Sequence, residues 1–124
     1  MIHLRQELTK LLKKYNPQVY YHDASSKAKY PYIVYSLPNS LPIEEQEVFV
    51  LDIDIWDNKD DTTVVETLAS TLWKALNKHN HVDSNIQFSI HRENRLPPLD
   101  EKENKIRRRK LIFSLRYFDR RIYE

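Results

Sequence analysis

The spacing of hydrophobic residues predicts two amphipathic helices. The first covers residues 2–15, and Asn16-Pro17 is expected to end it, because proline disfavours helical geometry in the residue before it and has no N–H to donate. The second is expected to begin at Thr63, which matches a capping box with Glu66, and to fray near Asn80. The apolar stripes are Leu4, Leu8, Leu11, Leu12 and Tyr15, and then Val65, Leu68, Ala69, Leu72 and Leu76.

Alternating apolar and polar residues predict the strands. The clearest is residues 46–56, with Phe49, Leu51, Ile53 and Ile55 on one face and Val48, Val50, Asp52, Asp54 and Trp56 on the other. Shorter strands are expected at residues 19–21, 32–37, 86–90 and 111–117. The last two are expected to form a hairpin, whose extended tip is the polar loop from Glu93 to Lys105 with Pro97-Pro98.

The order of these elements indicates the fold class. A helix, two or three strands, a second helix and two more strands show no regular strand–helix alternation. We therefore expect one α+β domain over residues 1–124, with an antiparallel sheet of about four to five strands and both helices packed on one face.

The absence of two residue types excludes several kinds of chemistry. The chain has no cysteine, so it has no disulfide, thiolate nucleophile or cysteine-ligated metal site. It also has no glycine, which phosphate-binding loops, dinucleotide fingerprints and the nucleophile elbow all require. Turns must be made by Asn, Asp, Ser and the six prolines.

No cluster of reactive residues is assembled in the sequence. Asp52, Asp54 and Asp57 form a D-x-D-x-x-D pattern that could hold Mg²⁺, but a solvent-facing strand carries such residues routinely. His79 and His81 lie two residues apart, whereas a zinc pair on a helix needs a spacing of four. We expect no catalytic residue, no metal and no cofactor, and hence a protein that is not an enzyme.

A basic cluster and several aromatic residues suggest binding surfaces. Arg107, Arg108, Arg109 and Lys110 could contact DNA phosphates, although such a cluster is more often a solvated or ion-pairing edge. The net charge of the chain is only +2. Trp56, Phe118 and Tyr35 are expected on the sheet face away from the helices, where a subunit interface would cover them.

Four segments together resemble the tail completion proteins of long-tailed bacteriophages, also called tail terminators or tail-to-head joining proteins. The segments are residues 29–35 (KYPYIVY), 50–57 (VLDIDIWD), 65–68 (VETL) and 107–118 (RRRKLIFSLRYF). The resemblance covers most of the chain from about Val19 onward.

This resemblance implies a virion assembly protein that caps the tail tube as a ring, commonly a hexamer, and forms the tail side of the head–tail junction. Its implied partners are further copies of itself, the tail-tube protein and the head connector or neck proteins. It would be assembled in the host cytoplasm and reside in the virion tail. We expect no membrane partner, since no apolar run approaches the roughly 20 residues of a bilayer span.

The expected contact residues combine this resemblance with the surface pattern. Candidates for the subunit or tail-tube interface are Trp56, Leu96, Pro97, Pro98, Leu99 and Phe118.

Two alternative functions stay open at this point. One is a head-completion or neck protein, which differs only in its partner. The other is a nucleic-acid-binding or nuclease module that uses the basic cluster and the Asp52/Asp54 pair.

Overall fold

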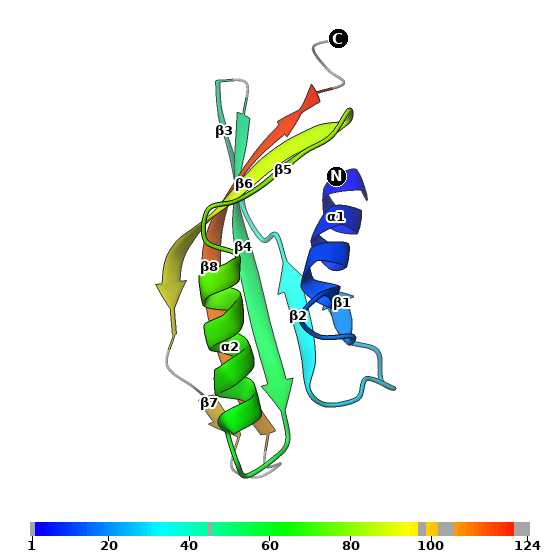
Figure 1. Ribbon diagram of the computed structural model, residues 1–124, viewed down its shortest axis with the longest axis vertical. Coiled ribbons are helices and arrows are strands. Elements are labelled where there is room, and N and C mark those ends of the chain that lie inside the picture. The colour runs from blue at the N-terminus through cyan, green and yellow to red at the C-terminus, as the bar shows by residue number, and fades with distance from the viewer. Residues whose placement is uncertain (1, 45, 97–98, 102–105, 121–124) are drawn as a thin grey trace.

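The computed structural model describes residues 2–44, 46–96, 99–101 and 106–120. Two helices, α1 (Ile2–Lys13) and α2 (Thr63–Ala75), lie on one side of a curled, mixed sheet (Figure 1). The order of strands across the sheet is β1 (Val19–Tyr21), β2 (Tyr32–Ser36), β4 (Gln46–Asp57), β8 (Ile106–Asp119), β6 (Ile86–Arg95) and β5 (His79–Val82). Two short strands, β3 (Ser40–Ile43) and β7 (Leu99–Glu101), pair with β4 and β8.

The α+β class and the placement of both helices on one face are confirmed, but the prediction of an antiparallel sheet of four to five strands is wrong. β1 pairs with β2 in parallel, with Val19 opposite Ile33. The long connection between these strands carries the chain back to the same end of the sheet, as a parallel pair requires. Residues His79–Val82, expected as the frayed end of a helix, form the edge strand β5 beside β6.

Strict alternation on the two central strands builds the core. Phe49, Leu51, Ile53 and Ile55 of β4 face the helices and are at most 5% exposed. They meet the equally buried residues of β8 and of both helices, and all belong to one hydrophobic cluster. β4 and β8 pair over eleven positions, from Glu47↔Tyr117 to Asp57↔Arg107, so the two strands form the centre of the fold.

The helix boundaries differ slightly from the predicted ones. α1 ends at Lys13, and the nearby Asn16 is buried, where its side-chain amide donates hydrogen bonds to the carbonyls of Gln18 and Pro31. The capping box at the start of α2 is wrong. Thr62 occupies the cap position without a side-chain hydrogen bond, and the Asp61 carboxylate instead accepts from the backbone N–H and hydroxyl of Thr63.

The predicted polar loop from Glu93 to Lys105 is largely strand where the structure describes it. β6 continues to Arg95 with a bulge between Arg92 and Asn94, and β7 pairs with the start of β8. The polar side chains at the end of β6 are exposed, so this part of the strand needs no apolar alternation. None of the described helices is long and apolar enough to cross a membrane.

Candidate functional site

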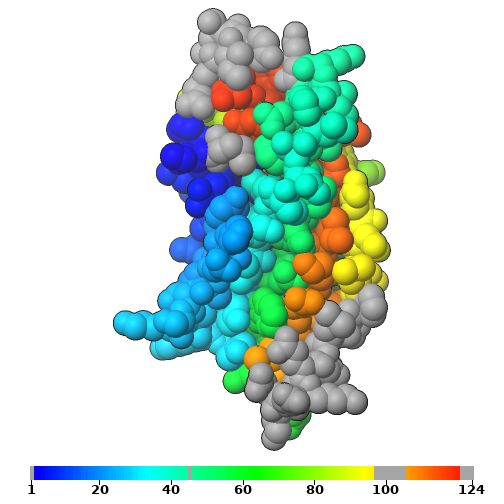
Figure 2. Space-filling view, turned by 180° about the vertical axis from the view of Figure 1, so that it is seen from behind, coloured from blue at the N-terminus to red at the C-terminus, as the bar shows by residue number. Residues whose placement is uncertain are grey.

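The side of the sheet opposite the helices is not covered by any other described element. Figure 2 shows β2, β4, β8 and β6 side by side on this surface, in cyan, green, orange and yellow. We call it the open face. Its side chains on the three central strands are mostly half-buried by their neighbours, and they are Tyr32, Val34 and Ser36 of β2, Val48, Val50, Asp52, Asp54 and Trp56 of β4, and Arg108, Lys110, Ile112, Ser114, Arg116 and Phe118 of β8.

A row of aromatic side chains crosses one end of the open face. Tyr32, Trp56 and Arg108 occupy directly paired positions on β2, β4 and β8. The rings of Tyr32 and Trp56 stack with centroids 6.3 Å apart, and the Arg108 guanidinium lies 5.3 Å from the Trp56 ring centroid. Tyr20 and Tyr30 extend the row, with ring centroids 6.1 and 5.2 Å from that of Tyr32. We call these five residues the aromatic row; tryptophan, tyrosine and arginine are the residue types that dominate binding energy at protein interfaces.

Beside the aromatic row, one lysine joins two aspartates. Lys110 Nζ donates to both carboxylate oxygens of Asp52, at 2.9 and 3.0 Å, and to Asp54 Oδ2 at 3.2 Å. Burial raises the pKa of Asp54, and the Lys110 charge opposes that effect. Burial alone would lower the pKa of Lys110, but its bonds to the two carboxylates outweigh burial and raise the pKa. The charges in the middle of this face are therefore largely neutralised within the chain.

The structure splits the predicted basic cluster between the two faces of the sheet. Arg108 and Lys110 lie on the open face, whereas Arg107 and Arg109 point to the helix side because strand side chains alternate. There Arg109 lies 3.5 Å from Glu66 of α2, and Arg107 lies 3.7 Å from Asp60. All four cations have acidic neighbours, so the geometry favours the ion-pairing interpretation over a continuous phosphate-binding surface.

The predicted interface residues have different outcomes. Trp56 and Phe118 lie on the open face, as expected from their strand positions. The placement of Tyr35 there is wrong: its side chain is fully buried on the helix side, its hydroxyl donates to the Arg5 carbonyl at 2.8 Å, and burial raises its pKa.

Leu96 is half-buried beside β8, where its N–H donates to the Lys110 carbonyl. Pro97 and Pro98 lie outside the described residues, and Leu99 pairs with Arg108 through the backbone.

The D-x-D-x-x-D pattern does not form a cluster of three carboxylates. Asp52 and Asp54 share Lys110 on the open face, while Asp57 is fully buried on the helix side, where one of its oxygens accepts from the Asn58 N–H. Strand alternation separates Asp57 from the other two, so the arrangement that a magnesium site would need is not present.

Sequence reasoning missed a group of three potential metal ligands. The side chains of Glu7 from α1, His81 from β5 and Asp83 from the following turn bring one ligand atom each within 4.8 Å of one another. His81 Nε2 lies 2.6 Å from Asp83 Oδ2 and 3.9 Å from Glu7 Oε2. Asp83 Oδ1 also accepts from the N–H groups of Asn85 and Ile86. These hydrogen bonds, the one to His81 first, lower the pKa of Asp83 to about 2.

The contacts of Asp83 and His81 are explained by their place in the fold. The carboxylate closes the turn between β5 and β6 and orients His81, which stacks on Phe88. No sequence signal could have found the group, because Glu7 is far from the other two residues in the chain. Comparison with known proteins adds no identification: no protein-family model matches the chain, and no curated protein matches it.

Proposed function

We propose that this protein is a non-enzymatic assembly component of a phage or prophage tail, which caps the tail tube as a ring and uses the open face to bind a partner protein. The observation that carries the proposal is the aromatic row on a sheet face that no other described element covers. A partner would bury Trp56, Tyr32 and Arg108 together, which is the composition of an energetic centre in protein interfaces.

Two further features support a protein partner. The charges beside the row are already paired, so covering Asp52, Asp54 and Lys110 would cost less desolvation than covering isolated charges. The four sequence segments that resemble tail completion proteins include residues 50–57 and 107–118, which build most of the open face. The proposal that the partner is a tail protein rests on the resemblance, and the proposal that it binds the open face rests on the composition of that surface.

A binding experiment with separate partners tests this proposal and divides it from its nearest alternative. The purified chain is mixed with the tail-tube protein of the same virus and, separately, with its head connector or neck protein. Binding to the tube protein supports the tail terminator role, and binding to the connector alone supports the head-completion role. Failure to bind either protein at high concentration contradicts both.

A further inference from the structure

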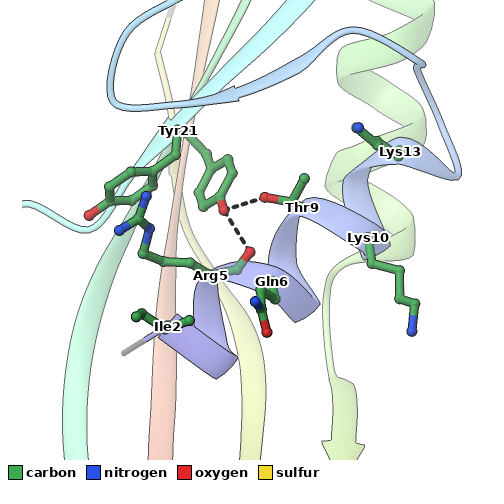
Figure 3. Close-up of a pocket in the computed structure, with 8 residues that line it drawn as sticks. Ile2, Arg5, Gln6, Thr9, Lys10, Lys13 and Tyr21 are labelled. Atoms are coloured by element: carbon green, nitrogen blue, oxygen red, sulfur yellow. Dashed lines mark hydrogen bonds between the residues drawn. The ribbon is translucent and has the colours of Figure 1, made fainter.

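A groove lies between α1 and the β1 edge of the sheet, away from the open face. Its volume is about 600 Å³, and residues lining it include Ile2, Arg5, Lys10, Lys13 and Tyr21 (Figure 3). The Arg5 guanidinium lies over the Tyr21 ring, 3.9 Å from its centroid. The Tyr35 hydroxyl bonds to Thr9 and to the Arg5 carbonyl, which holds α1 against the sheet. The groove thus combines an apolar floor with cationic side chains.

The three cations of this groove have no acidic partner among the residues that the structure describes. Arg5, Lys10 and Lys13 are exposed, and among the described residues none of them forms an ion pair. Ile2 is 66% exposed, the largest value for any large hydrophobic residue that the structure describes. A ligand for this site would therefore be apolar and acidic.

The hairpin of β3 and β4 has the complementary properties. Leu41 and Ile43 of β3 are 61% and 49% exposed. Glu44 and Glu47 are exposed and, like the groove cations, form no ion pair with any other described residue. The chain has no lysine or arginine between Lys29 and Lys59. In Figure 1 this hairpin projects from one end of the molecule, apart from α1, and none of its described residues lines the groove.

The turn of this hairpin carries a residue that its backbone disfavours. Ile43 pairs with Gln46, and Glu44, which follows Ile43 in the turn, has a φ of 56°. Asn or Gly is the usual residue in that conformation, because other side chains crowd the backbone. Glutamate at this position presents a carboxylate at the tip of the hairpin at some cost to the turn.

We infer that the β3–β4 hairpin of one copy of this chain binds in the α1 groove of the next. Leu41 and Ile43, on one face of the hairpin, would cover Ile2 and Tyr21, while Glu44 at its tip and Glu47 on its other face would pair with cations along the groove. Because the two surfaces differ, the contact is head-to-tail, and such contacts close into rings or extend into filaments. The inference deepens the proposed ring and leaves the open face free for the tail-tube protein.

Charge reversal on each surface tests the pairing. The groove variant is Arg5→Glu/Lys10→Glu/Lys13→Glu, and the hairpin variant is Glu44→Lys/Glu47→Lys. Sedimentation velocity at low salt, alone and with tail-tube protein, should show wild-type oligomers, whereas each variant alone should stay at the monomer mass of 15.0 kDa. In an equimolar mixture of the two variants, each groove meets a hairpin of opposite charge, because the reversed hairpin of one variant faces the reversed groove of the other, so the mixture should assemble again.

Controls separate the contact from general charge and from folding. Lys27→Glu/Lys29→Glu/Lys59→Glu makes the same change in net charge at other exposed lysines and should assemble like wild type. Glu44→Asn relieves the turn, so it should raise the melting temperature while weakening assembly about tenfold. A merely structural role for Glu44 would not give opposite effects.

The outcomes distinguish this inference from the ring itself. Wild-type assembly that neither charge-reversal variant disturbs overturns the inference and leaves the ring standing. Loss of assembly in both variants that their equimolar mixture does not restore also overturns it. A wild-type chain that stays monomeric at every concentration, alone and with tail-tube protein, overturns the ring and the inference together.

Discussion

The two faces of β4 and β8 differ although both are formed by the same two strands, whose side chains point alternately to one face and the other. On the helix side, Leu51, Ile53, Leu111 and Phe113 are fully buried in the core. One position along, Asp52, Asp54, Lys110 and Ile112 lie half-buried on the open face. One face is covered by the two helices, and the other is covered by no other element that the structure describes. Substitutions at adjacent positions of one strand should therefore have different effects: those on the helix side should reduce stability, and those on the open face should reduce binding.

The largest expected effect is on the helix side. Phe113→Ala removes a fully buried ring that packs 5.4 Å from Trp73, measured between ring centroids. It should lower the free energy of unfolding by about 3–5 kcal/mol because it leaves a cavity. Ile112→Ala on the open face is the matched control and should cost about 1 kcal/mol. Urea denaturation measures both, and equal losses would contradict the assignment of the two faces.

The next effect concerns the ion cluster of the open face. Lys110→Met removes the cation that joins Asp52 and Asp54 and leaves the Arg108 guanidinium, 3.9 Å from Asp54, as their cationic neighbour. Because these side chains are about one-fifth exposed, the expected loss is about 1–2 kcal/mol, below that of a fully buried pair. Adding Asp54→Asn to Lys110→Met should recover part of it. A double variant no more stable than Lys110→Met would show that Asp54 is not the destabilised partner.

A pH dependence distinguishes the open face from the β5–β6 turn. Asp83 has a pKa lowered to about 2 from 3.8, so its stabilisation is present above pH 3.8 and is lost as pH falls towards 2. Asp83→Asn should therefore weaken the dependence of stability on pH in this acidic range. Asp54 has a raised pKa, so its contribution is present below pH 3.8 and is lost as pH rises through the raised value. Thermal unfolding from pH 2 to 7 should therefore shift in opposite senses for Asp83→Asn and Asp54→Asn.

The sequence predicted what local periodicity determines. The apolar faces of α1, α2 and β4 follow from spacing alone, as do the open-face positions of Trp56 and Phe118. The same alternation could have corrected the prediction for Tyr35, since this residue shares a face with Ile33 and both are fully buried. Its hydroxyl is accommodated on the helix side because it finds hydrogen-bond partners on α1.

Features that depend on contacts between distant segments could not be predicted. The acidic neighbours of Arg107 and Arg109 come from the loop before α2 and from α2 itself. The groove forms where Tyr21 of β1 meets Arg5 of α1, and no spacing in the sequence encodes that meeting. The edge strand β5 has no apolar alternation to reveal it, and its pairing with β6 decides its structure.

The central claim is that the open face binds a partner protein, and one substitution tests it most directly. Ile112→Lys places a charge beside Asp52 on this face and should leave the chain folded, with a free energy of unfolding within about 1 kcal/mol of wild type. Light scattering of the chain mixed with tail-tube protein should show a complex for wild type and the separate masses for Ile112→Lys. A folded Ile112→Lys variant that joins the complex as well as wild type would contradict the claim.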